Sequence, residues 1–224
     1  MTRARNLVRL TQTEPFRLAA PFGCGVQTGA GTVLNTLRVA VGDSLLVVGT
    51  GAVGMSAVMA SRTAGASPIV AVDPVVQRRA LSLALGATHA LDPVEVADGA
   101  LTEVAGGFDY AIDTSGRSEM IRAAVAGVHS TGVVVLLASG PPEATVDVPL
   151  RDVVLGRQVR GAVEGDSVPQ EFIPRLLALW RQGRFPVEAL VTTFPETEIN
   201  EAMRAMRLDS AVKPVVVFGV TTKT

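Results

Sequence analysis

A glycine-rich turn between two apolar segments most constrains how this chain can fold. Residues Leu45 to Gly54 read LLVVGTGAVG, so four apolar residues run into the pattern G-x-G-x-x-G and a helix-forming stretch follows. In this pattern Gly49 permits a tight turn, Gly51 leaves room for a pyrophosphate, and Gly54 lets the helix pack on the strand. The first backbone N–H groups of that helix then face the phosphates. The motif therefore predicts a dinucleotide-binding strand–turn–helix unit.

An acidic residue at a suitable distance supports this interpretation. Asp73 lies nineteen residues after Gly54, at the end of the apolar segment 69–72. Its carboxylate can accept hydrogen bonds from an adenosine ribose there, and it would repel a 2′-phosphate. The pattern therefore favours NAD over NADP, although Arg78 and Arg79 weaken this preference because either side chain can reach the ribose. Two alternatives stay open: a glycine turn that only reverses the chain, and an S-adenosylmethionine-dependent methyltransferase, which shares both features.

Apolar segments alternate with helix-like stretches through the middle of the chain. Strands that are apolar on both faces are typical of a parallel sheet covered by helices, so the pattern predicts an α/β fold with a doubly wound, mostly parallel sheet. Turn residues dilute the pattern only over 93–107. The strands expected here are 44–48, 69–73, 89–91, 110–113 and 132–137, and the helices are 54–64, 77–85 and 118–128.

The C-terminal third has shorter apolar segments and more separate helices. The strands expected in it are 146–148, 159–163, 190–194 and 215–220, and the helices are 150–155, 169–182 and 199–207.

Residue counts exclude several classes of function. The only cysteine is Cys24, so neither an intrachain disulfide nor a four-cysteine zinc site can form. A formal net charge of −1 gives no excess of positive charge with which to bind nucleic acid or an anionic membrane. No apolar run approaches the roughly 18 residues of a membrane helix, and the first ten residues have no apolar core of a signal peptide. The expected location is the cytoplasm.

The segment before the glycine turn carries a resemblance to a known family. Residues Pro21 to Gly31 read PFGCGVQTGAG, and residues 41–44 read VGDS. Together with the turn, these segments closely resemble the zinc-dependent medium-chain alcohol dehydrogenases, over nearly the whole chain. Segments 156–167 and 181–185 fit the aryl-alcohol (benzyl alcohol) dehydrogenase branch best.

This resemblance implies a division into three parts. Residues 26–163 would be an NAD-binding Rossmann domain, and residues 1–25 and 164–224 would be remnants of a catalytic domain at both ends. It also implies a homo-oligomer, a dimer or tetramer, formed at the sheet edge that residues 146–148 and 159–163 would provide.

The resemblance further assigns site residues. Cys24 would be the last of three protein ligands of a catalytic zinc. Thr28 and Val53 would lie at the nicotinamide, whereas Asp73 would hold the adenosine ribose. Arg78 would lie at the adenine side, and Lys213 would face the pyrophosphate. The full set implied for NAD is Thr28, Gly49, Gly51, Ala52, Val53, Gly54, Asp73, Arg78, Ala138, Gly140, Ala162, Glu164 and Lys213.

The sequence also departs from the family. Full-length relatives carry a long N-terminal half that supplies the other zinc ligands, a Cys and a His, and the hydroxyl that relays the alcohol proton. No such residues are found here, and one thiolate does not hold a catalytic zinc. We therefore expect the NAD-binding portion of a zinc-dependent alcohol dehydrogenase, inactive alone and without bound zinc.

In an intact relative, hydride would pass from a primary, aromatic alcohol to NAD+, so the implied partners are a small alcohol and its aldehyde. The alternative is a stand-alone, non-catalytic NAD(H)-binding module.

Strands 190–194 and 215–220 would expose their edges in either case, unless they pair with each other or with a second copy.

Overall fold

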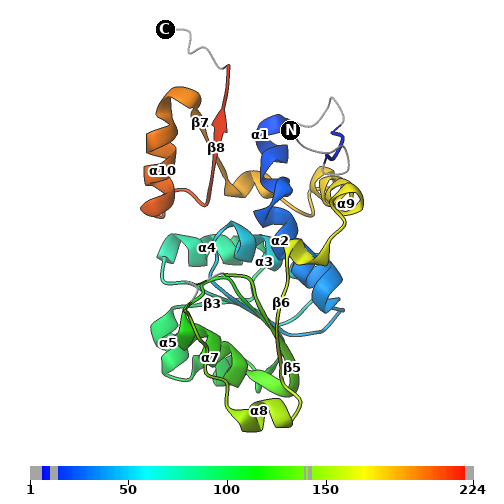
Figure 1. Cartoon of the computed structure of the whole chain (residues 1–224), viewed down its shortest axis with the longest axis vertical. Coiled ribbons are helices and arrows are strands. Elements are labelled where there is room, and N and C mark those ends of the chain that lie inside the picture. Colours follow the sequence, from blue (N-terminus) through cyan, green and yellow to red (C-terminus); the bar gives the residue numbers. More distant parts are fainter. Residues whose placement is uncertain (1–6, 11–14, 139, 141–142, 220–224) are drawn as a thin grey trace.

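The computed structural model describes residues 7–10, 15–138, 140 and 143–219. Most of these residues form a six-stranded sheet covered by helices, with a smaller α/β unit at the C-terminal end (Figure 1). Parts of the predicted segment 1–25, and Val220 at the end of the predicted strand 215–220, lie outside the described residues.

The central sheet is parallel throughout, in the order β3-β2-β1-β4-β5-β6. The chain first builds outward from β1 to β3 and then returns to place β4 against β1, so the direction of winding reverses between these two strands. This arrangement confirms the predicted doubly wound fold. The strands are β1 Leu45–Val48, β2 Ile69–Val72, β3 His89–Leu91, β4 Phe108–Asp113, β5 Val128–Leu136 and β6 Gln158–Gly161.

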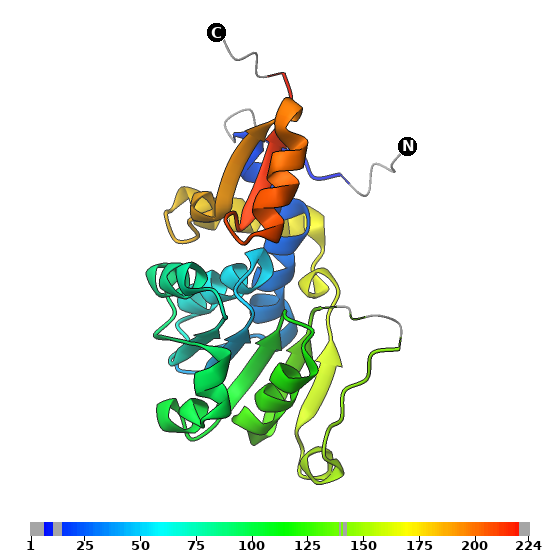
Figure 2. The same cartoon turned by 90° about the vertical axis from the view of Figure 1, so that its left-hand side faces the viewer.

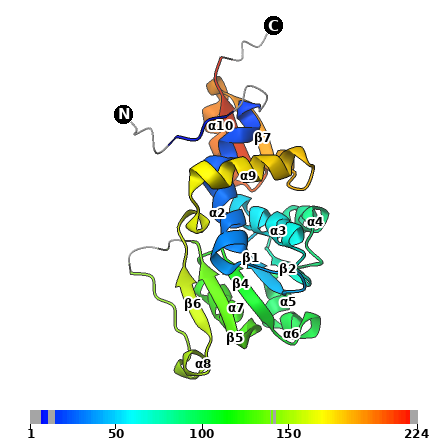
Figure 3. The ribbon, with the colours of Figure 1, turned by 90° about the vertical axis from the view of Figure 1, so that its right-hand side faces the viewer.

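Helices cover both faces of this sheet (Figures 2 and 3). On one face Val26, Met55 and Leu176 pack with Leu45 and Ile69 in the larger buried cluster. These helices are α2 Gly25–Gly31, α3 Ala52–Ala64, α4 Val76–Leu85 and α9 Pro169–Arg181. The other face carries the second apolar cluster, beneath α5 Pro93–Ala97, α6 Ala100–Val104 and α7 Ser118–Gly127.

The segment before β1 brings α2 into backbone contact with α3. A Cβ atom on Gly29 would lie 2.0 Å from the carbonyl oxygen of Val53 and 3.0 Å from the backbone nitrogen of Ala57. A glycine is therefore required for the two helices to approach this closely. The segment consists of α1 Phe16–Ala19, η2 Ala20–Gly23, α2, and the π-helical η3 Thr32–Leu37.

A polar link joins β1 and β4 at their amino ends. The backbone N–H and the hydroxyl of Ser44 both donate to Oδ2 of Asp109, at 2.8 and 2.7 Å. These hydrogen bonds lower the pKa of the Asp109 carboxyl below its ordinary value of 3.8. The glycine turn lies at the opposite, carboxyl edge of the sheet.

The C-terminal residues form a small unit of their own. Strands β7 Val191–Pro195 and β8 Lys213–Val217 pair in parallel, joined through η6 Glu196–Glu198 and α10 Ile199–Arg207. The sequence left open whether these strands would pair with each other, and the structure shows that they do. Within the described residues, no helix is both long and apolar enough to cross a membrane.

The predicted strand at 146–148 was wrong. Residues 146–149 are extended without a ladder, since β6 is the strand that pairs with the outer side of β5. Pro149 also lacks the N–H group that a ladder needs. Helix α8 Leu150–Val154 and the edge strand β6 were predicted within a few residues.

The sequence pattern also missed α5 and α6 in the segment 93–107. Asp92 begins α5 with a capping box: its carboxylate accepts from the N–H of Val94, and Glu95 accepts from the N–H of Asp92. Two helices of five residues each are too short to show an apolar period. The capping box at Asp92 was the sequence signal from which α5 could have been predicted.

We predict that Gly29→Ala lowers the free energy of unfolding by about 1–3 kcal/mol, because the added methyl group must push α2 away from α3. Chemical denaturation measures the effect. Gly106→Ala is the matched control, since nothing lies within 4 Å of a Cβ at that position. Equal stability of the two variants would contradict the close packing of α2 on α3.

Candidate functional site

The glycine turn lies between β1 and α3 at the carboxyl edge of the sheet. Gly49 has φ +83°, and a Cβ on it would lie 2.5 Å from Oγ1 of Thr114. A Cβ on Gly54 would lie 1.9 Å from the carbonyl oxygen of Gly49. By contrast, nothing lies within 4 Å of a Cβ on Gly51. Gly49 and Gly54 are therefore required by the packing of the turn, whereas Gly51 borders open space.

The start of α3 faces that space. Gly51 is the N-cap of this 13-residue helix, and neither a capping side chain nor an acidic residue occupies its first turn. The first N–H groups of a helix have no intrahelical partner and carry the positive end of the helix dipole. The backbone of residues 52–54 thus fits an anionic group such as a diphosphate.

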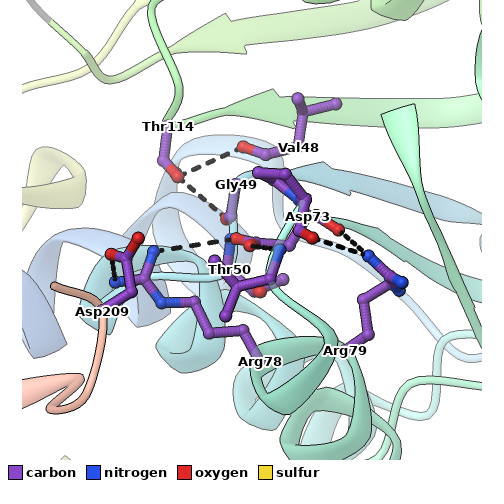
Figure 4. Close-up of polar contacts among 10 residues, drawn as sticks. Val48, Gly49, Thr50, Asp73, Arg78, Arg79, Thr114 and Asp209 are labelled. Carbon is purple, nitrogen blue, oxygen red and sulfur yellow. Dashed lines mark hydrogen bonds and ion pairs between the residues drawn. The ribbon is translucent and has the colours of Figure 1, made fainter. Parts of the chain in front are cut away.

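Asp73 ties the glycine turn to the end of β2. Its Oδ2 accepts the backbone N–H of Thr50 at 2.7 Å (Figure 4). Its Oδ1 accepts the N–H of Val75 at 2.9 Å. The residue is only 2% exposed. The sequence placed Asp73 beside the turn on the basis of spacing, and the structure brings the two together. It adds a structural role, because the carboxylate holds the turn in place.

Two further polar residues lie at the carboxyl end of β4, where one of them contacts the glycine turn. The Thr114 hydroxyl is within hydrogen-bond distance of the carbonyl oxygens of Gly49 and Val48, at 2.9 and 3.2 Å (Figure 4). Asp113 is fully buried and accepts from the Ser115 hydroxyl at 2.6 Å and from the Gly116 N–H at 2.8 Å. Sequence reasoning did not find Thr114. Its position directly after the strand that neighbours β1 was the available signal.

The two arginines of α4 have separate partners. Nη1 of Arg79 donates to the carbonyl oxygen of Asp73 at 2.7 Å and to Oδ2 of Asp92 at 2.8 Å. Nη2 of Arg78 donates to Oδ1 of Asp209 at 2.6 Å, and its Nη1 lies 4.0 Å from Oδ2 of Asp73 (Figure 4). Of the two, Arg78 is therefore the one whose guanidinium lies beside the carboxylate of Asp73.

A mostly apolar cavity of about 500 Å³ adjoins the turn. It lies between the carboxyl ends of β1 and β2 on one side and helices α5 and α7 on the other. Its size and apolar walls suit a planar ring system. The sequence did not reveal it, because α5 was missed. The lining includes Val48, Val72, Pro74, Pro93, Val96, Arg117 and Met120.

The predicted nicotinamide residues come from several elements. Thr28 is partly exposed on α2, and its hydroxyl donates to the carbonyl oxygen of Cys24 at 3.0 Å. Val53 lies on α3, which α2 contacts directly. Ala138 and Gly140 follow β5, and Ala162 follows β6. Since β5 and β6 end at the same edge as β1, these backbone segments lie along one side of the sheet.

Two further residues predicted at the cofactor lie in η4 Glu164–Asp166 and at the start of β8. The Glu164 carboxylate accepts from Nε2 of Gln27 at 2.7 Å, so its side chain is bound to α2. Lys213 opens β8 in the C-terminal unit and is partly buried.

Cys24 is an exposed free thiol just before α2. Over the described part of the chain, no three His, Cys, Asp or Glu side chains are grouped closely enough to hold a metal ion. A catalytic zinc needs three protein ligands, so the residues present do not fit one.

Comparison with known proteins identifies the family. The family model described as zinc-binding dehydrogenase matches residues 52–181, more than half of the chain. This chain belongs to the zinc-binding dehydrogenase family. It is 40% identical over 223 residues to a geraniol dehydrogenase of Castellaniella defragrans, an alignment that covers 97% of this chain and 60% of that enzyme. It is 33% identical to an alcohol dehydrogenase class-2 isozyme of Oryctolagus cuniculus, covering 95% of this chain and 58% of that enzyme.

Solved structures of the family agree in fold. The benzyl alcohol dehydrogenase of Acinetobacter calcoaceticus superposes with a TM-score of 0.93 at 35% identity, covering 97% of this chain and 61% of that one. A zinc-binding-domain alcohol dehydrogenase protein from Burkholderia ambifaria gives a TM-score of 0.92 at 42% identity, with 96% and 59% covered. The resemblance inferred from the sequence is confirmed. The chain spans about three-fifths of the length of these relatives.

We predict that Asp73→Asn lowers the free energy of unfolding by about 1–3 kcal/mol, because an amide has one acceptor oxygen for two backbone donors, one buried and one partly buried. Thermal or chemical denaturation measures the loss. Asp147→Asn, at an exposed loop position, is the control and should leave stability unchanged. If both variants were as stable as the wild type, Asp73 would not be holding the turn.

Proposed function

We propose that this chain binds NAD(H) across the carboxyl edge of its sheet, as the cofactor-binding part of a zinc-dependent alcohol dehydrogenase. The observation that carries the proposal is the open space beside Gly51, which adjoins both the uncapped start of α3 and the buried carboxylate of Asp73. A turn that served only to reverse the chain would have no need of a glycine at this position.

Each part of the cofactor has a suitable place. The N–H groups of residues 52–54 would hold the pyrophosphate, with Lys213 as its cation, and Asp73 would accept from the adenosine ribose. The apolar cavity beside β1 and β2 would take the adenine, with Arg78 on that side of the site. Thr28 and Val53 would border the nicotinamide, together with the segments after β5 and β6 that hold Ala138, Gly140, Ala162 and Glu164.

The bound nicotinamide supplies a hydride acceptor for an alcohol carbon. The residues of this chain bind and orient the cofactor, but they do not supply the Lewis acid that holds an alkoxide. We therefore propose that the chain alone has no turnover and binds no zinc, and that Cys24 serves as a zinc ligand only in a protein that provides the other ligands. The likeness to a benzyl alcohol dehydrogenase supports a primary, aromatic alcohol as substrate of such a protein.

A stand-alone, non-catalytic NAD(H)-binding module is the second candidate. The pairing of β7 with β8 favours it, because among the described residues these two strands form a sheet of their own. Both candidates predict NAD(H) binding, and they differ in whether a zinc-carrying N-terminal half restores alcohol oxidation.

We also propose that two copies associate through the outer side of β6. Leu150 and Val154 of α8 are each 76% exposed, and Val163 after β6 is 82% exposed. Together with the unpaired edge of β6, these apolar side chains suit a two-fold contact.

Titration with NADH, followed by nucleotide fluorescence, tests the proposed function when zinc is measured in the same sample. We predict micromolar binding of NADH, no binding of S-adenosylmethionine, less than stoichiometric zinc and no oxidation of benzyl alcohol. Gly51→Val should abolish binding, because its side chain would fill the space beside α3. Gly23→Val is the matched control on an exposed glycine with nothing within 4 Å of its Cβ position.

Failure of the wild-type chain to bind NADH would contradict the proposal. Binding of S-adenosylmethionine in its place would indicate a methyltransferase. Oxidation of benzyl alcohol by the chain alone would contradict the part of the proposal that concerns the missing zinc ligands.

A further inference from the structure

An ion pair lies beside Asp73, the residue proposed to hold the adenosine ribose. Arg78 lies on α4, five residues after Asp73, and its guanidinium lies between two carboxylates (Figure 4). Nη2 donates to Oδ1 of Asp209 at 2.6 Å, whereas Nη1 is 4.0 Å from Oδ2 of Asp73. The Arg78 side chain is 19% exposed, and its buried Nε has no hydrogen-bond partner among the described residues. The guanidinium of Arg78 thus lies closer to the carboxylate of Asp209 than to that of Asp73.

Asp209 reaches this position from the C-terminal unit. It follows α10 in a left-handed conformation, with φ +58°, and its side chain is 44% exposed. Aspartate and asparagine tolerate this conformation better than most residues because their short polar side chains can hydrogen-bond locally. The turn after α10 therefore holds a carboxylate over α4, 131 residues along the chain from its partner.

The charges beside Asp73 are unfavourable for a second phosphate. Two carboxylates and one guanidinium give this group a formal charge of −1, and Arg79 is already bound to Asp92 and to two backbone carbonyls. A 2′-phosphate carries close to two negative charges and binds well where an arginine can donate to it. Arg78 is the arginine that pairs with the carboxylate of Asp73, and Asp209 occupies one end of its guanidinium.

We infer that Asp209 is a positioning residue for cofactor specificity: by binding Arg78, it withholds that guanidinium from a 2′-phosphate and so favours NAD(H) over NADP(H). This inference rests on the proposed function, since it assumes that the adenosine ribose lies at Asp73. It extends that function by adding a determinant from the C-terminal unit, outside the strand–turn–helix motif. Asp73 alone would then be an incomplete guide to the preferred cofactor.

Asp209→Asn tests the inference in the full chain. Asparagine retains the left-handed backbone and the size of the side chain but removes the charge, so Arg78 becomes available. We expect the dissociation constant of NADPH, measured by fluorescence, to fall about tenfold, a typical effect of one charge-assisted hydrogen bond, while that of NADH stays within about twofold. Asp166→Asn is the matched control, since Asp166 also has a positive φ (+48°) and pairs with an arginine, Arg160, at 3.1 Å.

The double variant Asp209→Asn with Arg78→Gln separates this role from a structural one. If Asp209 acts through Arg78, the gain in NADPH affinity should disappear in the double variant. A loss of melting temperature alone, with an unchanged ratio of NADPH to NADH affinity, would overturn the inference. So would an equal gain in the Asp166→Asn control. If the wild type bound neither nucleotide, the proposed function and this inference would both fail, whereas wild-type NADH binding with an unchanged ratio would overturn only the inference.

Discussion

The carboxylate of Asp73 is the interaction on which the candidate site depends. It accepts one backbone N–H from the turn after β1 and another from the segment after β2; the first contact is buried and the second is partly buried. Because an unpaired donor in the interior is costly, this single group fixes the path of the glycine turn and with it the direction of α3. The open space beside Gly51 exists only while that turn is held. The residue that would recognise the ribose is therefore also the one that shapes the phosphate site.

The close packing of α2 on α3 is a second constraint on the shape of the site. Gly29 brings α2 against α3, and Gly31 meets Gly165 in the turn after β6, so elements far apart in the sequence share one core. This packing keeps Thr28 near the start of α3 and closes the larger apolar cluster over the sheet. The C-terminal unit then contributes Asp209, which binds Arg78 beside Asp73. The site is built from the beginning, the middle and the end of the chain.

Much of this could be predicted from the sequence, for identifiable physical reasons. Buried parallel strands are apolar on both faces, and Gly49 and Gly54 are required by the packing of the turn, so the sheet and the turn follow from local pattern. The pairing of Arg78 with Asp209 could not be predicted, because nothing in the spacing relates a helix of the sheet to a turn after α10. Helix α5 was missed because five residues carry no clear period, and the apolar cavity beside it was missed with it. The strand expected at 146–148 failed because the sheet edge was already taken by β6.

Hydrogen–deuterium exchange of the whole chain with and without NADH tests the central claim most directly, because it locates the bound cofactor on the backbone. The first N–H groups of α3 have no intrahelical acceptors and should exchange rapidly in the free chain. The account predicts that NADH slows exchange in residues 52–54, and also in the turn after β4, while β7 and β8 are unaffected. Protection confined to another part of the molecule, such as the cavity lined by Arg38, Arg175 and Arg184, would contradict it.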